Sequence, residues 1–321
     1  MGKIKVIGLG AMNTDLIYLV ERIVSDGETT AKKFCTAPGG SAANTTYGLA
    51  KLGVDTGFIG AVGDDEAGRM LLGDFESAGV ESTRVTIKPK AETGSALCIT
   101  DRAGRRTLYV SPGANSLLNA RDVDLKYLKQ AEFVHLSSFI DLKQFHIQQR
   151  LISELPPSVK VSLAPGELYA AKGLGTLAPM LGKTYVLFLN QHELKQLTGQ
   201  GLEKGAQRCL ERGCKTVAIT LGKGITRQGK TMACYLIDGE EGCFIEAEPV
   251  VKQRLLETTG AGDAFAAGVL YGLLTGKGLR ECGVLGEIMA QFCIRKIGAR
   301  AGLPLLAELA QQYQDRTGSL L

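Results

Sequence analysis

The sequence contains no tryptophan, and aromatic residues make up only 6% of its 321 positions. Proteins that hold single-stranded nucleic acid stack the bases on aromatic side chains, so we do not expect this chain to bind nucleic acid. The net charge of +4 at pH 7 is small, and acidic and basic residues are interspersed along the chain. The sequence therefore lacks the strongly basic footprint that binds nucleic acid or a membrane surface. A small molecule is the expected partner.

Long apolar runs and paired cysteines are missing as well. No apolar stretch approaches the roughly 20 residues that cross a bilayer, so no membrane span is expected. The eight cysteines form no C-x-x-C pair and no zinc-like spacing with the three histidines. We interpret them as small apolar residues in a reducing compartment. Because no signal-peptide pattern precedes the first expected strand, the expected location is the cytoplasm.

The chain does contain a regular alternation of apolar strands and helices. The strands are apolar on both faces, which is typical of a parallel sheet covered by helices. We therefore expect a three-layer α/β/α fold in a single domain spanning 1–321. Two stretches, about 14–38 and 93–111, break the alternation, and each is predicted to be a hairpin of a small β-sheet lid. The expected strands of the main sheet are Lys3–Leu9, Thr56–Val62, Phe133–Ser137, Val159–Leu163, Tyr185–Leu189 and Thr216–Leu221, and the expected helices include Ala42–Leu52, Glu66–Ala78, Arg121–Gln130 and Leu142–Leu155.

The stretch with the clearest chemistry is T-T-G-A-G-D at 258–263, which leads into an apolar helix expected at Ala264–Leu274. Its small residues let backbone N–H groups approach a ligand closely, and a helix start binds phosphate well. A carboxylate such as that of Asp263 repels phosphate unless it has another role. The role that fits is a general base, which takes a proton from a hydroxyl as its oxygen attacks a phosphoryl group. The alternative is an acidic residue that only stabilises the first helical turn.

Polar residues also follow the first expected strand. Asn13 and Asp15 come just after Lys3–Leu9, at the edge where open α/β sheets bind ligands; ordinary turn chemistry is the alternative. The glycines at 8 and 10 resemble a dinucleotide fingerprint, but Asn13 stands where the third glycine belongs. An enzyme that uses NAD is therefore not expected.

A second glycine-rich junction lies at Gly39 and Gly40, before an expected helix in which Ser41 would be the N-cap. Asn44 in the first turn offers both a donor and an acceptor to a hydroxylated ligand. A routine loop-to-helix junction is the alternative.

Two further polar groups follow the later strands. Asn190 and Glu193 can hold Mg²⁺ through water, because Mg²⁺ keeps much of its hydration; a helix capping box explains the same spacing. Thr220 and the turn at 222–224 follow the next strand and suit a nucleotide phosphate.

Taken in order, these features resemble the ribokinase-like (PfkB) carbohydrate kinase family, from Gly8 to about Gly298. The resemblance implies transfer of the γ-phosphoryl group of Mg²⁺·ATP to a hydroxymethyl group. It also implies the following roles: Asp263 as base; the N–H groups of Gly260, Ala261 and Gly262 as an anion hole; Asn13, Asp15, Gly39, Gly40 and Asn44 at the substrate; Asn190, Thr220, Gly222, Gly224, Cys293 and Gly298 at the nucleotide; Glu193 at Mg²⁺; and Glu257 at a monovalent cation such as K⁺.

Several departures from the family leave the substrate open. Glu257 stands where the family usually has Asp, so activation by K⁺ is in doubt. Ser41 replaces the Lys common in ribokinases, and the strand end at 135–138 lacks their Glu. A sugar or sugar derivative is the first expectation, which the shortage of aromatics favours. A nucleoside, as in adenosine kinase-like members, is the alternative, and a non-catalytic binding protein is the third. A nucleoside would need an apolar slot from the lid, for which the candidates are Leu16, Ile17, Leu97, Ile99 and Phe139. Exposed lid edges also predict a homodimer.

Overall fold

The computed structural model describes residues 3–103, 105–248 and 258–321. The described residues form a nine-stranded sheet of order β13-β12-β11-β10-β9-β8-β1-β4-β5 and a four-stranded sheet of order β3-β2-β6-β7. The large sheet consists of β1 (Val6–Leu9), β4 (Thr56–Gly63), β5 (Val85–Lys88), β8 (Phe133–Ser137), β9 (Lys160–Ala164), β10 (Thr184–Asn190), β11 (Thr216–Arg227), β12 (Lys230–Asp238) and β13 (Gly242–Glu246).

Neighbouring strands of the large sheet are parallel from β5 at one edge, through β4, β1, β8, β9 and β10, to β11. At the other edge, β12 and β13 are added antiparallel. The mainly parallel sheet is therefore confirmed. In the parallel part, the carboxyl ends of the strands share one edge, which is where Asn190 of β10 and Thr220 of β11 pair in register. That edge is the expected place for a ligand site in an open α/β sheet.

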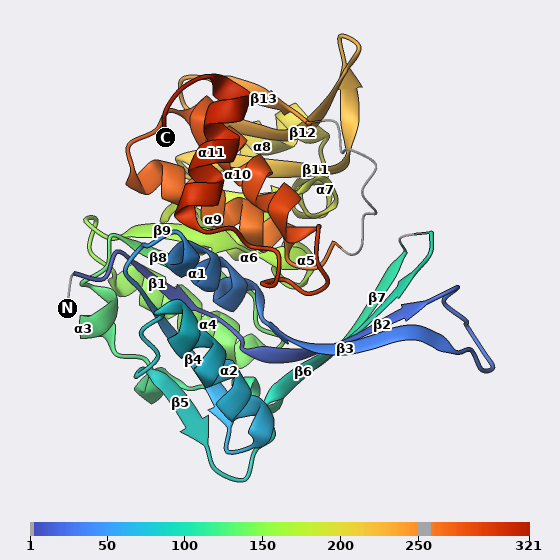
Figure 1. The fold of residues 1–321 in the computed structure, drawn as a ribbon. Helices are drawn as coiled ribbons and strands as arrows, with labels where there is room; N and C mark the ends of the chain where they lie inside the picture. The colour runs from blue at the N-terminus through green and yellow to red at the C-terminus, as the bar shows by residue number, and fades with distance from the viewer. Residues whose placement is uncertain (1–2, 104, 249–257) are drawn as a thin grey trace.

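Helices cover both faces of the large sheet (Figure 1). Alternate residues of one strand belong to different cores: Val6 packs with residues of α9 and α10, whereas Ile7 packs with residues of α4 and α6. This division explains why the strands are apolar on both faces, and it confirms the three-layer expectation. The α-helices are α1 (Ser41–Lys51), α2 (Glu66–Ala78), α3 (Leu125–Leu128), α4 (Leu142–Glu154), α5 (Gly166–Ala170), α6 (Gly173–Leu181), α7 (Gln191–Thr198), α8 (Leu202–Glu211), α9 (Ala261–Leu274), α10 (Leu279–Cys293) and α11 (Leu306–Thr317).

Some element boundaries differ from the predictions for local reasons. The helix predicted at 121–130 shrinks to α3, because the Asp124 side chain accepts from the backbone N–H groups of Lys126 and Tyr127 and starts a separate helix there. The strand predicted to end at Leu221 continues to Arg227 as β11. None of the helices among residues 3–103, 105–248 and 258–321 is long and apolar enough to cross a membrane.

The four-stranded sheet, hereafter the small sheet, projects from the body of the molecule (Figure 1). It forms from both stretches that were predicted to be hairpins, with β2 parallel to β6 in the middle. Its inner face carries Ile17 and Cys98, which pack against Ile297 from the loop after α10. Its strands are β2 (Asn13–Val20), β3 (Ala31–Gly39), β6 (Gly94–Asp101) and β7 (Arg106–Ser111).

Candidate active site

The turn before α9 has a backbone that only glycine adopts easily. Gly260 is the N-cap of α9 with φ of 80°, in the left-handed region. A Cβ placed on Gly260 would lie 2.3 Å from the Cβ of Ala299, so the turn packs tightly on the loop after α10. A Cβ on Gly262 meets nothing within 4 Å. The start of α9 is therefore closed by Ala299 on one side and open at Gly262.

The side chain of Asp263 lies in the first turn of α9 and is held by the first turn of α1. Ser41 donates its hydroxyl to Oδ1 of Asp263 at 2.7 Å, and the Asn44 amide donates to Oδ2 at 2.8 Å. The prediction that Ser41 caps α1 was wrong, because Gly40 is the N-cap and Ser41 is the first helical residue. The serine hydroxyl binds the carboxylate instead of the helix backbone.

The electrostatic surroundings of Asp263 are mixed. Burial raises the pKa of the Asp263 carboxyl, while the hydrogen bonds from Asn44 and Ser41 and the charges of Arg106 and Arg300 act in the opposite direction. Arg106, the first residue of β7, donates to the hydroxyl of Thr259 at 3.2 Å. The small sheet thus brings a cation to the turn that precedes α9. A partly buried carboxyl with a raised pKa and specific donors is typical of an acid–base group in an active site.

The predicted substrate residues lie together near Asp263. Asn13 pairs with Gly39 across β2 and β3, and the Asn115 amide donates to Oδ1 of Asn13 at 2.9 Å. A Cβ on Gly39 would lie 2.2 Å from a carboxylate oxygen of Asp15, so this carboxylate lies directly against the Gly39 backbone. Gly40 follows and leads into α1. The arrangement collects carboxylate and amide groups suited to hydrogen-bond hydroxyls.

Asn190 and Glu193 form the capping box that was the alternative explanation for their spacing. The Asn190 side chain accepts from the Glu193 N–H at 2.8 Å, and the Glu193 carboxylate accepts from the Asn190 N–H at 2.9 Å. Burial nevertheless raises the pKa of Glu193, and the charges of Asp263 and Glu167 raise it further. These carboxylates are therefore close enough to repel one another, and a cation would relieve that repulsion.

The donor set fits Mg²⁺ only in a partly hydrated form. Within the described parts of the chain, no three His, Cys, Asp or Glu residues are arranged to hold a metal. Mg²⁺ is commonly bound by one or two carboxylates together with phosphate oxygens and water, which one free oxygen of Glu193 would suit. Glu257, the candidate for a monovalent cation, lies outside the described residues.

The glycines after Thr220 lie inside β11 and not in a turn after it. Gly222 and Gly224 have φ of 59° and 84°, and the register between β11 and β12 shifts between Thr220 and Ile225. A bulge in a long strand thus takes the place of the predicted turn. Thr220 stays beside Asn190 at the carboxyl edge of the sheet.

The last two predicted nucleotide residues lie around the Gly260 turn. Cys293 is 1% exposed, and its Sγ lies 3.6 and 3.4 Å from the carbonyl oxygens of Thr259 and Ala299, so its thiol can donate to either of them. Its side chain lies beneath the turn. A Cβ on Gly298 would lie 3.1 Å from the Cβ of Ala37, which places Gly298 against the small sheet.

Most of the residues proposed as a base slot do not line this region. Leu97 and Ile99 lie with Tyr18 along a cavity of about 510 Å³ on the outer face of the small sheet, opposite Asp15 and Ile17. Leu16 pairs with Leu97 and shares the outer face. Phe139 is buried in the core of the main body. Of the five candidates only Ile17 is on the inner face.

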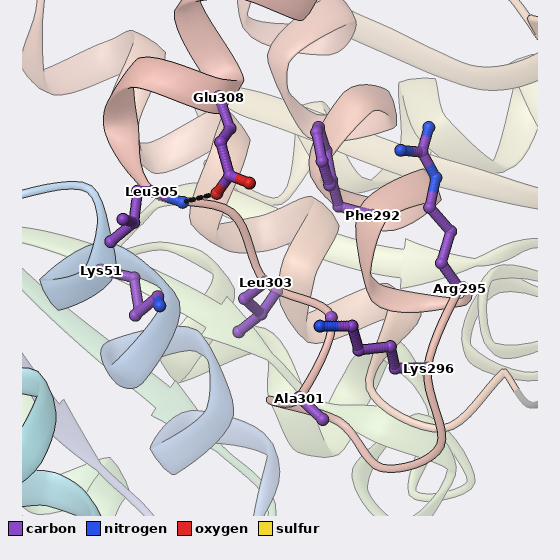
Figure 2. Close-up of a pocket in the computed structure, with 9 residues that line it drawn as sticks. Lys51, Phe292, Arg295, Lys296, Ala301, Leu303, Leu305 and Glu308 are labelled. Atoms are coloured by element: carbon purple, nitrogen blue, oxygen red, sulfur yellow. Dashed lines mark hydrogen bonds between the residues drawn. The ribbon is translucent and has the colours of Figure 1, made fainter.

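A second cavity, of about 350 Å³, lies elsewhere on the molecule (Figure 2). It is lined by Lys51 at the end of α1, by Phe292 and Lys296 near the end of α10, and by Leu305 and Glu308 at the start of α11. Lys51 lies ten helical residues beyond Ser41, which corresponds to roughly 15 Å along α1. This cavity is therefore separate from the surroundings of Asp263.

Residues 3–306 match the sequence pattern of the pfkB family carbohydrate kinases. The chain belongs to this family. An uncharacterized sugar kinase of Archaeoglobus fulgidus is 38% identical over 260 residues, which cover 80% of this chain and 98% of that one. A protein of Halopiger xanaduensis named ATP-dependent ribose-1-phosphate kinase is 31% identical over 273 residues, which cover 85% of this chain and 86% of that one. The structure of Arabidopsis thaliana ribokinase with ribose and ATP matches with a TM-score of 0.81 at 25% identity, covering 98% and 99% of the two chains.

Three residues of this carbohydrate kinase near Asp263 were missed in the sequence. Ser41 was expected to cap a helix, Arg106 lay unremarked in the predicted lid, and Arg300 was not singled out. A lone arginine in a sequence is usually a solvated surface residue. Only the pairing of β7 and the packing of the loop after α10 bring these two cations to the site.

Proposed function

We propose that this kinase transfers the γ-phosphoryl group of ATP to a hydroxymethyl group of a small sugar or sugar derivative, with Asp263 as the general base. The observation that carries the proposal is the Asp263 carboxylate, held at 2.7 and 2.8 Å by two donors at the open start of α9. A merely helix-stabilising acid would not need donors from another helix. A carboxylate oriented in this way beside N–H groups is equipped to accept a proton where phosphate binds.

In the proposed reaction the substrate hydroxyl donates a hydrogen bond to Asp263. As the oxygen attacks phosphorus, its proton moves to the carboxylate, the bond to the bridging oxygen breaks, and ADP leaves. The N–H groups at the start of α9, from Gly260 to Gly262, stabilise the charge on the transferred phosphoryl group. Each such donor is worth about 10²–10³ in rate. The Ala261 N–H also donates weakly to the Thr258 carbonyl at 3.3 Å, so it would change partner when phosphate binds.

We propose that Glu193 binds Mg²⁺ through water, while Asn190 holds the Glu193 backbone in place by the reciprocal hydrogen bonds of the capping box. Mg²⁺ bound with ATP neutralises phosphate charge and favours in-line transfer. We propose that Thr220, which pairs with Asn190 in the sheet, contacts phosphate. The bulge at Gly222 and Gly224 bends β11 beyond that point.

Arg106 is proposed to supply positive charge to the phosphoryl group when the small sheet closes as a lid. Its guanidinium already reaches Thr259, and its charge opposes the rise in the pKa of Asp263 that burial causes. We expect Arg106→Gln to lower kcat by about 10- to 10²-fold, the range for loss of a charge-assisted hydrogen bond. Since the cation favours ionised Asp263, its loss should also move the acidic limb of the pH profile of kcat/KM to higher pH.

Arg102, which pairs with Glu21 at the exposed tip of the same sheet, provides the matched control. Arg102→Gln should leave kcat and the acidic limb of the pH profile unchanged. An acidic limb that stays in place in Arg106→Gln contradicts the assignment.

A sugar or sugar phosphate is the proposed substrate class. Asn13, Asp15 and Asn44 present hydroxyl-binding groups beside the base. The similarity to the relative named ribose-1-phosphate kinase supports including phosphorylated sugars. A nucleoside is less favoured, because Leu16, Leu97 and Ile99 lie on the outer face of the small sheet and would not line a base slot.

The test is an ADP-release assay with Mg²⁺·ATP against two panels. One contains ribose, ribose 1-phosphate, fructose, tagatose phosphate and ketodeoxygluconate; the other contains adenosine, inosine, guanosine and cytidine. Turnover in the first panel supports the proposal. Turnover only in the second overturns the substrate class but keeps the reaction. Binding of sugars without any ADP release would support a non-catalytic binding protein.

We also propose that the outer face of the small sheet pairs with a second copy of the chain. This face carries Tyr109 and Phe34, which are 63% and 52% exposed, beside the cavity of about 510 Å³. An exposed apolar patch of this kind marks an interaction site. Sedimentation of the intact chain tests this proposal, and a monomer at micromolar concentration would overturn it.

A further inference from the structure

Arg300 is a buried cation that the reaction outlined above does not use. It follows α10 and is 5% exposed. Its guanidinium lies between two rings, 5.2 Å from the centroid of Tyr47 and 5.1 Å from that of Phe75. Burial of a charged group is costly unless the group is paired and hydrogen-bonded. The surroundings of Arg300 must therefore supply acceptors.

Each nitrogen of the guanidinium donates to a different element. Nη1 donates to Oδ2 of Asp74 on α2 at 2.5 Å, and Nη2 donates to the carbonyl of Gly39 at the end of β3 at 3.0 Å. Nε donates to Oδ1 of Asn44 on α1 at 2.9 Å. Arg300 thus joins the small sheet and two helices at the place where the proposed substrate residues meet.

The third of these bonds fixes the orientation of the Asn44 amide. An amide has one accepting oxygen and one donating nitrogen, whereas a guanidinium can only donate and a carboxylate can only accept. With Arg300 on one side and Asp263 on the other, the oxygen must face Arg300 and the nitrogen must face Asp263. If the Asn44 amide were flipped, its NH₂ group would face the donating guanidinium of Arg300 and its oxygen would face the accepting carboxylate of Asp263. The observed orientation, with Nδ2 of Asn44 2.8 Å from Oδ2 of Asp263, is the one that satisfies both neighbours.

We propose that Arg300 is a positioning residue that acts through Asn44: it locks the Asn44 amide so that its nitrogen holds the Asp263 carboxylate in place for proton removal. This inference rests on the proposed role of Asp263 as base. Arg300 does not touch the reacting atoms in this scheme. Through the Gly39 carbonyl it also fixes the end of β3 beside Asp15.

A purely structural role for Arg300 would stabilise the fold without favouring turnover in particular. Arg300→Lys separates the two roles, because lysine keeps the charge but lacks the planar fork that holds three acceptors at once. We expect Arg300→Lys to lower kcat by about 10- to 10²-fold, as a small misplacement of a catalytic group does, with the KM for ATP unchanged. The control is Asp74→Asn, which leaves an acceptor for Nη1 and the bond to Asn44. It should lower the melting temperature while kcat stays within about 2-fold of wild type.

The decisive comparison is a double-mutant cycle with Asn44→Ala. If Arg300 acts through Asn44, Arg300→Lys should change kcat by less than about 2-fold once Asn44 is already alanine. Equal losses of kcat in both backgrounds would overturn the inference, as would unchanged kcat in Arg300→Lys alone.

A readout without substrate keeps this test separate from the proposed function. The two side-chain N–H signals of Asn44 can be recorded by ¹⁵N NMR in the intact chain and assigned by their loss in Asn44→Ala. We expect slow exchange with water and a wide separation of the signals in wild type and in Asp74→Asn, and averaged, fast-exchanging signals in Arg300→Lys. Unchanged signals in Arg300→Lys would overturn the positioning role. If Asp263→Asn kept full turnover, the base assignment would fail, while these signals would still report whether Arg300 fixes the amide.

Discussion

Replacement of Asp263 by asparagine is expected to lower kcat by about 10²- to 10⁴-fold, the contribution of a well-placed general base. Asparagine has nearly the same shape as aspartate but cannot take a proton from the substrate hydroxyl. The affinity for Mg²⁺·ATP, measured by calorimetry, should stay within a few-fold of wild type, because the variant retains the helix start that we propose binds phosphate. Steady-state kinetics with a substrate from the productive panel provide the measurement.

The matched control is Asp64→Asn, at an exposed carboxylate that pairs with Arg69 on the surface. Its kcat should equal that of wild type, since exposed pairs contribute little. Turnover of Asp263→Asn within a few-fold of wild type would show that another group removes the proton. In that case the hydrogen bonds that Ser41 and Asn44 donate to Asp263 would stabilise the fold without contributing to proton removal.

The second large effect is expected from Gly260→Ala. Its added methyl would lie 2.3 Å from the Cβ of Ala299 and 2.6 Å from its Cα, and its φ of 80° is strained for any residue with a Cβ. The turn and the loop that carries Ala299 and Arg300 must therefore move apart. Because the N–H groups of the turn are the proposed anion hole, we expect kcat to fall by about 10²–10³-fold, together with a lower melting temperature.

Gly276→Ala controls for the backbone strain alone. Gly276 has φ of 73°, close to that of Gly260, but a Cβ placed there meets nothing within 4 Å. We expect it to lose about 1–2 kcal/mol of stability, the cost of a left-handed backbone, and to keep wild-type kcat. If Gly260→Ala behaved like Gly276→Ala, the turn would not need to be tightly packed for turnover.

The sequence was sufficient to predict those parts of the fold that follow from periodicity. The strand β8 is apolar on both faces and bounded by turn residues, and its limits were predicted to the residue. The limits of β4, β9 and β10 were predicted to within one residue. The short helices α5 and α6 were missed, because their glycines and Pro179 argue locally against a helix. Tertiary packing decides their conformation, and the local sequence does not encode that packing.

The candidate site could be proposed from the sequence where one stretch carries the chemistry, as at 258–263, but not where residues distant in the sequence meet. The spacing of Asn190 and Glu193 was compatible with a capping box and with a metal site, and the structure contains the capping box. Arg106 and Arg300 come near Asp263 only because of the register of β7 and the position of the loop after α10. No short-range pattern in the sequence reports either of these.

The central claim, phosphoryl transfer to a hydroxymethyl oxygen by the base Asp263, is tested most directly by proton-coupled ³¹P NMR of the reaction mixture. The chain is incubated with Mg²⁺·ATP and a substrate from the productive panel, in parallel with Asp263→Asn. We predict a phosphomonoester signal split into a triplet by the two protons of the CH₂ group in the wild-type reaction, and at least about 10² times less of it with the variant. A new phosphomonoester signal split into a doublet by a single proton, which marks phosphorylation of a secondary hydroxyl, or inorganic phosphate as the sole product would contradict the account.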